Sequence, residues 1–400
     1  MTELPFRFLF EAETIQFLRE NEEKDPESFL LSKALSNKGW DTRLLARQLK
    51  GLKIAKQKFP SFYNNPNILY PPSVSLEQAS SEATARFKAS LVKAERIVDL
   101  SGGMGIDSYF LSLQCNELVY VEPQEELLRL ASHNFKALRA DHVHCICQTA
   151  AGYLATQDQS CDLFYIDPSR RKEGKRLSNH LDWEPDIIGL KPQLWKRSKQ
   201  ILIKLSPMTD ITEICKALGE VREIFVVSDR NECKEVLLLL ERGFKDEPHI
   251  HVVMLNVKGE RRFSFYVSEE QEATPLFSIP LQYFYEPDAA LLKAGAFKKI
   301  ALDNGVKKIH PHTHLYTSET LKEKFPGKIF DLVEVKPYSK NSIEALTGKE
   351  KDFHVLTRNA TITAEQIKKQ YKLVERGNNY LIIFKGGDGS TYIAKAVRMS

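Results

Sequence analysis

The stretch RIVDLSGGMGID, residues 96–107, decides the fold of this chain. Residues 97–100 form a short apolar run that carries one acid, Asp99, and a glycine-rich turn follows at once in residues 101–105. Asp107 is a favoured N-cap residue, and the apolar side chains after it have helical spacing. The pattern predicts a strand, a glycine turn and a helix. Because glycines let a backbone approach a ligand closely and helix-opening amides favour acceptors, we expect a nucleotide-like cofactor here.

Apolar runs and helical segments alternate downstream of this stretch. Such alternation predicts a mostly parallel sheet that is covered on both faces. Three later runs lack intervening helices and are predicted as antiparallel strands at the end of the sheet. The fold class is therefore α/β, a Rossmann-like sheet in the methyltransferase variant of the doubly wound fold. The predicted strands are residues 97–100, 118–121, 143–146, 163–166, 201–204 and 224–227, and the later runs are residues 235–240, 249–256 and 262–267.

Acids end the first two strands, at the edge where such sheets bind ligands. Asp99 is placed to meet a cationic amino group, and Glu122, before Pro123, can accept both hydroxyls of a ribose. NAD sites use an acid in the same way, but the turn lacks the GxGxxG spacing that seats a pyrophosphate, which favours S-adenosylmethionine. Gln148 and Thr149 follow the third strand, where adenine would lie, although ordinary turn residues would look alike. The predicted cofactor contacts are Asp99, Ser101, Gly102, Gly103, Gly105, Asp107, Glu122, Pro123, Gln148, Thr149 and Asp167.

The fourth strand ends in Asp167, Pro168, Ser169, Arg170 and Arg171. An acid and a proline at that tip suit a rigid loop that orients a substrate, so the first four of these residues are the predicted catalytic group. Arg170 and Arg171 can hold a phosphate bidentately. The alternative is a turn with two solvated arginines.

The N-terminal 72 residues are predicted to be helical, with apolar side chains at helical spacing in residues 10–18, 29–35 and 44–54. Residues 47–58 form a basic amphipathic helix, which contacts nucleic acid or presents a solvated face. Prolines then mark a linker. The spacing of Ser75 and Gln78 fits a capping box and predicts the start of the helix that leads into the core domain.

The C-terminal part changes character beyond residue 275. A helix is predicted from Ala289 to about Leu302, and three alternating histidines, His310, His312 and His314, are predicted to be exposed in a turn without metal. The last 75 residues are predicted as strand, helix, strand, helix and hairpin, in residues 329–335, 342–346, 353–356, 364–371 and 380–397, with the hairpin turn at residues 386–389.

Charge is distributed unevenly along the chain. The net charge is +4, but residues 321–400 hold 15 Lys and Arg against 9 Asp and Glu. A basic terminal domain can contact phosphates, or it can simply be a lysine-rich solvated surface. Lys336, Lys340 and Arg358 lie at predicted element ends and are the candidate RNA contacts in this domain.

Composition excludes several classes of protein. With 42% hydrophobic and 28% charged residues, the chain has no apolar run near the roughly 18 residues of a membrane span. The N-terminus does not read as a signal peptide. The six cysteines form no CxxC pair, which favours reduced thiols over a metal site. We therefore expect a cytoplasmic protein without a membrane or metal partner; the sequence does not indicate its oligomeric state.

Five segments together resemble one family. They are LEQASSEATARFKA (residues 76–89), DLSGGMGIDS (99–108), YIDPSRR (165–171), KLSPMTDI (204–211) and EPDAALLKAGAF (286–297). The combination is similar to the bacterial THUMP-like methyltransferases, which are class I S-adenosylmethionine-dependent enzymes. The resemblance implies a helical region (1–72), a methyltransferase domain (73–272), a ferredoxin-like segment (273–325) and a THUMP-like domain (326–400). THUMP domains are associated with RNA, so tRNA or rRNA is the implied substrate class.

Two departures from related enzymes narrow the chemistry. Ser169 and Arg170 replace the proline and aromatic residue of the (Asp/Asn)-Pro-Pro-(Tyr/Phe/Trp) loop that stacks on a flipped base. No cysteine follows the strand where enzymes acting on pyrimidine carbon 5 carry their nucleophile. The mechanism that remains is direct transfer of the methyl group to a nucleophilic nitrogen or oxygen, in which Asp167 orients or deprotonates the acceptor. The alternatives are a catalytically inactive cofactor- or RNA-binding module, or a methyltransferase of small molecules or proteins.

Overall fold

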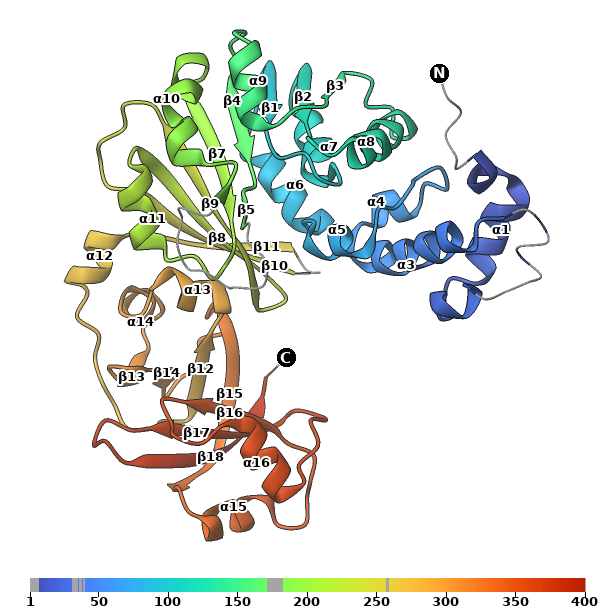
Figure 1. Ribbon diagram of the computed structural model, residues 1–400. Coiled ribbons are helices and arrows are strands. Elements are labelled where there is room, and N and C mark those ends of the chain that lie inside the picture. Colours follow the sequence, from blue (N-terminus) through green and yellow to red (C-terminus); the bar gives the residue numbers. More distant parts are fainter. Residues whose placement is uncertain are drawn as a thin grey trace. The chain divides into compact units, whose positions relative to one another are not determined.

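The computed structural model describes residues 7–30, 35, 38, 40–170, 183–256 and 259–399 (Figure 1). The chain forms two compact units. The first comprises residues 1–205, 212–221 and 238–245, and the second comprises residues 206–211, 222–237 and 246–400. No helix within the described ranges is both long enough and apolar enough to cross a bilayer.

Short helices build the N-terminal region, as predicted. Asp41 caps α3 by accepting hydrogen bonds from the backbone amides of Arg43 and Leu44, at 2.9 and 3.1 Å. The apolar stripe of α3 includes Leu45 and Leu49, which are fully buried. Most of the helix predicted at residues 29–35 lies outside the described residues. The elements are η1 (Arg7–Phe10), α1 (Ala12–Glu20), η2 (Pro26–Phe29), α3 (Thr42–Lys58) and α4 (Pro60–Tyr63).

The helix predicted to start at Ser75 is two helices, α5 (Ser73–Gln78) and α6 (Glu82–Ser90). The break occurs because Ala79 is extended, with ψ 152°. Ser81 then caps α6, accepting a hydrogen bond from the Thr84 amide at 3.3 Å. The predicted capping box at Ser75 is therefore wrong, since that serine lies inside α5.

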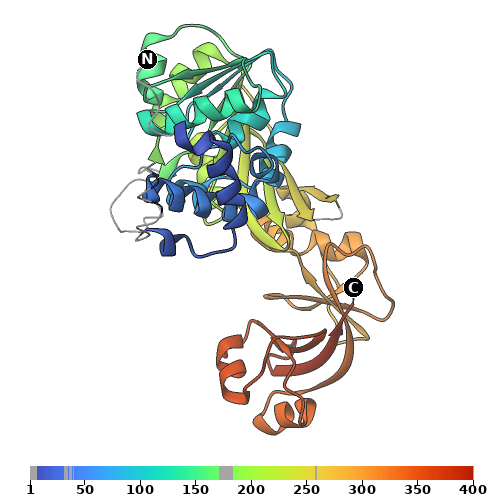
Figure 2. The ribbon, with the colours of Figure 1, turned by 90° about the vertical axis from the view of Figure 1, so that its right-hand side faces the viewer.

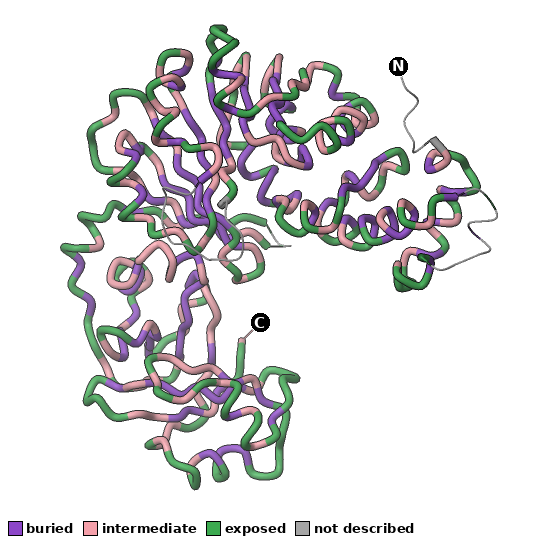
Figure 3. Tube along the Cα trace, in the orientation of Figure 1, coloured by how far each residue is buried: buried purple, intermediate pink, exposed green. Residues whose placement is uncertain are grey.

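Parallel strands form the centre of the large sheet, and each predicted strand from 97 to 204 is present. Residues of β4 are all buried, as expected for a strand covered on both faces. Buried residues follow these strands in Figure 3, and helices pack along them in Figures 1 and 2. The strands are β1 (Arg96–Asp99), β2 (Glu117–Val121), β3 (Val143–Ile146), β4 (Leu163–Ile166) and β7 (Gln200–Leu205), and the helices are α7 (Ile106–Ser112), α8 (Glu125–Ala137), α9 (Ala150–Thr156), α10 (Ile187–Arg197) and α11 (Ile211–Leu218).

The strand order is β11-β10-β8-β9-β7-β4-β1-β2-β3, with β8 (Val221–Asp229), β9 (Glu232–Glu241), β10 (His249–Asn256) and β11 (Gly259–Tyr266). Arg230 and Asn231 join β8 to β9 with positive φ angles of 51° and 65°. Such a two-residue turn makes an antiparallel hairpin. The three later strands were predicted to be antiparallel at the end of the sheet, and two of them differ from this prediction. Strand β9 is inserted inside the sheet, and β10 pairs parallel to β8; only β11 is an antiparallel strand at the edge.

A second sheet of seven strands has the order β13-β14-β12-β15-β18-β17-β16. The long strand β15 pairs with β12 on one side and β18 on the other, so one sheet runs through this whole region. The predicted helix from Ala289 is split, because Gly295 adopts φ 79° and ends its first part. The strands are β12 (Tyr283–Pro287), β13 (Lys307–His310), β14 (Thr313–Ser318), β15 (Gly327–Pro337), β16 (His354–Arg358), β17 (Asn379–Lys385) and β18 (Thr391–Arg398), and the helices are α12 (Val267–Glu272), α13 (Ala289–Ala294), α14 (Lys299–Asn304), α15 (Lys340–Thr347) and α16 (Ala364–Tyr371).

Candidate active site

A cavity of about 820 Å³ opens at the carboxyl ends of β1, β2 and β4. This is the edge where open parallel sheets bind ligands. It brings together most of the residues predicted for the cofactor and two of those predicted for catalysis. Its lining includes Asp99, Ser101, Gly102, Gly103, Gly105, Asp107, Glu122, Pro123, Thr149, Asp167 and Ser169.

The glycine turn is held tightly against β2. Gly103 and Gly105 have φ angles of 58° and 81°, which L side chains rarely adopt. A Cβ atom on Gly102 would lie 2.5 Å from ring atoms of Tyr120, and the Tyr120 hydroxyl donates a hydrogen bond to the Gly103 carbonyl at 2.5 Å. The turn therefore needs glycine for packing as well as for ligand approach.

Glu122 is buried and links the turn to β2. Its two carboxylate oxygens each accept a backbone amide hydrogen bond at 2.8 Å, from Gly103 and from Gln124. A carboxylate oxygen has a second lone pair. Glu122 therefore fixes the glycine turn and can still accept hydroxyls of a ribose.

Asp99 is 1% exposed and lies among three donors. It accepts hydrogen bonds from the backbone amide and hydroxyl of Ser101, at 2.8 and 3.0 Å, and from the Ser108 hydroxyl at 2.5 Å. Burial raises the pKa of Asp99 to about 7. The Ser101 hydroxyl also accepts a hydrogen bond from the Asp167 amide at 2.7 Å, so it connects the tips of β1 and β4.

Asp107 was predicted to cap α7, and this prediction is wrong because Gly105 occupies the N-cap position. Its carboxylate instead accepts hydrogen bonds from the Ser80 and Tyr165 hydroxyls, at 2.7 and 2.8 Å, and pairs with the fully buried Lys88 at 3.2 Å. Burial alone would raise the pKa of Asp107, but attraction by Lys88 and Lys204 outweighs it and leaves the pKa below its ordinary value.

Lys88 and Lys204 were not among the residues predicted for the site. Lys204 lies on β7 and forms an ion pair with the Asp167 carboxylate. Both lysines lie in segments that carry the family resemblance, at residues 76–89 and 204–211. Nothing in their spacing indicates burial, since a lysine on a helix or strand is usually solvated.

The predicted catalytic loop is only partly placed in the cavity. Asp167 and Ser169 line it, whereas Pro168 does not. Ser169 and Arg170 form the short strand β5 (Ser169–Arg170), which pairs with β6 (Trp183–Glu184). Arg171 lies outside the described residues, so its predicted contact with phosphate stays a prediction.

Residues from 183 to 190 also line the cavity, and the sequence analysis did not predict them. Trp183 is 8% exposed, and Asp186 caps α10 by accepting a hydrogen bond from the Gly189 amide at 3.0 Å. The available signal was an aromatic residue followed by an N-cap aspartate. The lining residues from this segment are Trp183, Glu184, Pro185, Asp186, Gly189 and Leu190.

Six of the described residues that line the cavity are acidic, and two of them, Asp107 and Asp167, pair with Lys88 and Lys204. The described lining contains the six acids Asp99, Asp107, Glu122, Asp167, Glu184 and Asp186, and neither Lys nor Arg. Such a lining favours a cation and disfavours a pyrophosphate. It therefore fits S-adenosylmethionine, whose sulfonium and amino groups are positive.

At the end of β3, Thr149 lines the cavity and Gln148 does not. Thr149 caps α9 by accepting a hydrogen bond from the Gly152 amide at 3.0 Å. The Gln148 side-chain oxygen accepts a hydrogen bond from the Thr156 hydroxyl at 3.4 Å. Only Thr149 of this predicted pair therefore lies where it can contact a cofactor in the cavity.

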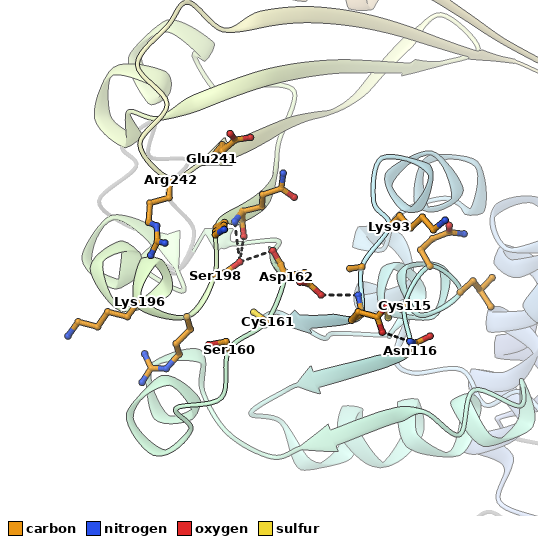
Figure 4. A pocket seen from close by; sticks show the side chains of 17 residues that line it. Lys93, Cys115, Asn116, Ser160, Cys161, Asp162, Lys196, Ser198, Glu241 and Arg242 are labelled. Carbon is orange, nitrogen blue, oxygen red and sulfur yellow. Dashed lines mark hydrogen bonds between the residues drawn. The ribbon is translucent and has the colours of Figure 1, made fainter.

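A larger cavity, of about 1230 Å³, lies at the opposite edge of the same strands (Figure 4). Glu95, Asn116, Asp162 and Lys199, which line it, precede β1, β2, β4 and β7. Its lining includes five basic side chains and three acidic ones. It contains none of the residues predicted for the cofactor or for catalysis.

The candidate RNA residues of the C-terminal region lie in the second unit. Arg358 and Lys328 both pair with Glu286, a carboxylate that is 2% exposed. Lys336 pairs with Glu334 at 2.9 Å, and Lys340 begins α15 with an exposed side chain. Arg358 therefore has a structural partner, and its predicted RNA contact is not tested by this geometry.

Of the three histidines predicted to be exposed in a turn, only His312 is exposed; His310 ends β13, His314 lies in β14, and both are half-buried. The His314 ring stacks on Phe297 with centroids 3.9 Å apart, and the His312 amide donates to His310 Nδ1 at 3.0 Å. No group of three or more His, Cys, Asp or Glu side chains with metal-site geometry occurs in the part of the chain that the structure describes.

Comparisons with known proteins agree with this architecture. Residues 283–326 match a ferredoxin-like domain and residues 327–396 match a THUMP domain-like family. A crystal structure from Porphyromonas gingivalis W83, of a protein proposed to be a methyltransferase, is 29% identical, with a TM-score of 0.85; the alignment covers 98% of this chain and 100% of that one.

Two curated relatives extend the comparison. An uncharacterised S-adenosylmethionine-dependent methyltransferase of Mycobacterium tuberculosis strain H37Rv is 24% identical over 79% of this chain and 84% of its own length. The 23S rRNA (uracil(747)-C(5))-methyltransferase of Vibrio vulnificus strain CMCP6 is 25% identical over 36% of this chain and 35% of its own length.

The comparisons, the sheet order and the cavity at the glycine turn support the same conclusion. S-adenosylmethionine is the cofactor that both the lining and the relatives support. The chain is a class I S-adenosylmethionine-dependent methyltransferase with a C-terminal THUMP-like domain.

Proposed function

We propose that the enzyme methylates a base in RNA by direct transfer from S-adenosylmethionine. The observation that carries the proposal is the acidic cavity, which suits a cationic methyl donor and an acceptor that enters without its phosphate. A base reaches such a cavity when it is turned out of its stack. The match to a THUMP domain-like family and the partial similarity to an rRNA methyltransferase support RNA as the carrier of that base.

The residues divide into two ends of the cavity. Asp99, Glu122 and the glycine turn would hold the methionine and ribose parts of the cofactor, and Thr149 would contact the adenine. Asp167 and Ser169, at the tip of β4, would face the acceptor. When bound, the cofactor supplies a methyl group that is already activated by its positive sulfur. The protein's task is therefore largely to position the acceptor.

Asp167 is suited to orient the acceptor. Its backbone amide is bonded to Ser101, and its carboxylate is paired with Lys204, so both parts of the residue are fixed. A fixed carboxylate oxygen can accept a hydrogen bond from an amino group on a base and later its proton. None of the six cysteines lines the cavity, so carbon 5 chemistry of the kind that needs a cysteine nucleophile is not proposed.

Incubation with radiolabelled S-adenosylmethionine tests the proposal. Total RNA from a strain that lacks the gene should accept label from the wild-type protein, and RNA from the parent strain should accept much less. Asp99→Ala should abolish the transfer. If label enters no RNA fraction while the protein binds the cofactor, the proposal is wrong; label in protein or small molecules would then favour one of those substrate classes.

A further inference from the structure

The acceptor end of the cavity contains an aromatic side chain that no comparison assigns. Trp183 lines the cavity although it is 8% exposed, so its ring is held by packing and is not free in solvent. Tyr165 is the other aromatic residue of the described lining, and its hydroxyl is bonded to Asp107. Trp183 therefore has the larger ring available to a ligand at this end.

The position of Trp183 follows from the short ribbon at the tip of β4. Trp183 pairs with Arg170, and Glu184 pairs with Ser169, four and three residues after β4 ends. Asp186 begins α10 immediately afterwards and fixes the exit of the ribbon. The tryptophan therefore lies on a paired strand that is followed by a capped helix, which suits a side chain that must hold one orientation.

The ribbon that carries Trp183 follows β4 and not β3. Strands β1 and β2 separate β4 from β3, and strands are about 4.8 Å apart, so the tips of β4 and β3 lie about 14 Å from each other. Thr149 at the tip of β3 marks the adenine end, and Asp167 at the tip of β4 marks the acceptor end. Trp183 belongs with the latter.

We propose that Trp183 is the stacking surface for the acceptor base, and that it replaces the aromatic residue absent from position 170. The inference rests on the proposed function. Aromatic rings bind bases of any sequence through their faces, so the ring selects a planar group. Trp183 is accordingly a binding and positioning residue, while Asp167 makes the polar contact.

Kinetics provide the first test. Trp183→Ala should raise the KM for unmethylated total RNA about tenfold to a hundredfold, as loss of one base stack predicts. Trp183→Phe, which keeps a ring, should recover most of that loss. Binding of S-adenosylhomocysteine should be unchanged in both variants. The matched control is Trp195→Phe, since Trp195 lies on α10 outside the lining and donates its indole N–H to Glu220.

Fluorescence provides a second test that needs no transfer reaction. The chain has three tryptophans, and a Trp40→Phe, Trp195→Phe double variant leaves Trp183 as the reporter. Adenosine, guanosine, cytidine and uridine, added with S-adenosylhomocysteine present, should quench its emission saturably.

The outcomes separate this inference from the proposed function. Wild-type transfer to RNA with unchanged KM in Trp183→Ala would overturn the stacking role alone. Equal loss of S-adenosylhomocysteine binding would also overturn it, because Trp183 would then contact the cofactor. If RNA accepts no label but nucleosides quench Trp183, the RNA proposal fails while planar-ring binding stands. If Trp183→Ala does not fold, Trp183→Phe and the quenching measurement still decide the question.

Discussion

The two edges of the parallel strands carry cavities of opposite character. The cavity at the carboxyl ends has a volume of about 820 Å³, and the described residues that line it include six acids and no Lys or Arg. The cavity at the amino ends has a volume of about 1230 Å³ and is lined by five basic side chains. In the larger cavity, Asp162 accepts hydrogen bonds from the backbone amides of residues 95 and 96, and Arg197 pairs with Asp158. Size alone therefore does not locate the chemistry. Buried charge, strand direction and glycine geometry do.

The largest expected effect is at Lys88, beneath the smaller cavity. Replacing Lys88 with Ala leaves the largely buried Asp107 carboxylate without its ion-pair partner, so the free energy of unfolding should fall by about 3–5 kcal/mol. Urea denaturation measures it. Lys93→Ala, at an exposed lysine of the larger cavity, is the matched control and should change little. Equal effects of the two substitutions would contradict the claim that buried charge distinguishes the edges.

Cofactor binding should be lost at one edge only. Asp99→Ala and Glu122→Ala should each weaken binding of S-adenosylmethionine about a hundredfold, because each removes a buried acceptor; Glu122→Ala also releases the Gly103 amide. Calorimetry measures the affinity, and circular dichroism checks the fold. Glu95→Ala in the larger cavity should bind normally. Normal binding in both of the first two variants would move the cofactor site elsewhere.

Alanine substitutions at two glycines distinguish the effect of backbone strain from the effect of side-chain crowding. Gly105 and Gly243 have φ angles of 81° and 85°, so alanine is strained at both positions. A Cβ on Gly105 would lie 2.8 Å from the Phe135 ring, while one on Gly243 meets nothing within 4 Å. Gly105→Ala should therefore cost about 1–3 kcal/mol more than Gly243→Ala in thermal or urea unfolding. Similar losses would show that crowding does not hold the turn.

The pH dependence of cofactor binding should follow the ionisation of the Asp99 carboxyl. Its pKa is about 7 because the carboxyl is buried, and a cationic cofactor binds the ionised form better. Affinity should therefore fall about tenfold between pH 8 and pH 6, and Asp99→Asn should flatten the profile. Titration calorimetry across that range is the measurement. An equally steep profile in Asp99→Asn would assign the effect to another group.

The raised pKa of Asp99 affects protein stability in the opposite direction to cofactor affinity as the pH rises. A carboxyl whose pKa is raised on folding binds its proton more tightly in the folded state, so its contribution is fully present below the unfolded value of 3.8. That contribution is lost as the pH rises through about 7. The wild-type protein should lose stability over this window relative to Asp99→Asn, whereas cofactor should restore it by binding.

Much of this edge was predictable because it depends on local patterns. Apolar runs fixed β3, β4 and β10 to the residue, and the hairpin of β17 and β18 followed from its glycine turn. Asp99 and Glu122 could be placed because strand ends meet at one edge. Each of these inferences uses spacing along the chain alone.

Other features required contacts between distant segments. The sequence does not show that β9 inserts inside the sheet, since strand order depends on packing between elements far apart. Lys88 and Asp107 are 19 positions apart, and Trp183 reaches the cavity through a ribbon with Arg170. The helix breaks at Ala79 and Gly295 were missed because helical periodicity continues through them.

The smallest expected effect is at the basic side chains of the larger cavity. Lys196 and Lys199 are exposed, and Figure 4 shows Lys196 extending away from Asp162. Replacing both with Ala should change RNA binding about twofold or less, because solvated lysines contribute mainly a screened attraction. Filter binding at two salt concentrations measures this, with Lys340→Ala in α15 as the comparison. A tenfold loss with a shallower salt dependence would make the larger cavity part of the RNA-binding surface, and the two edges would then act on the same substrate: one on its phosphates and the other on its base.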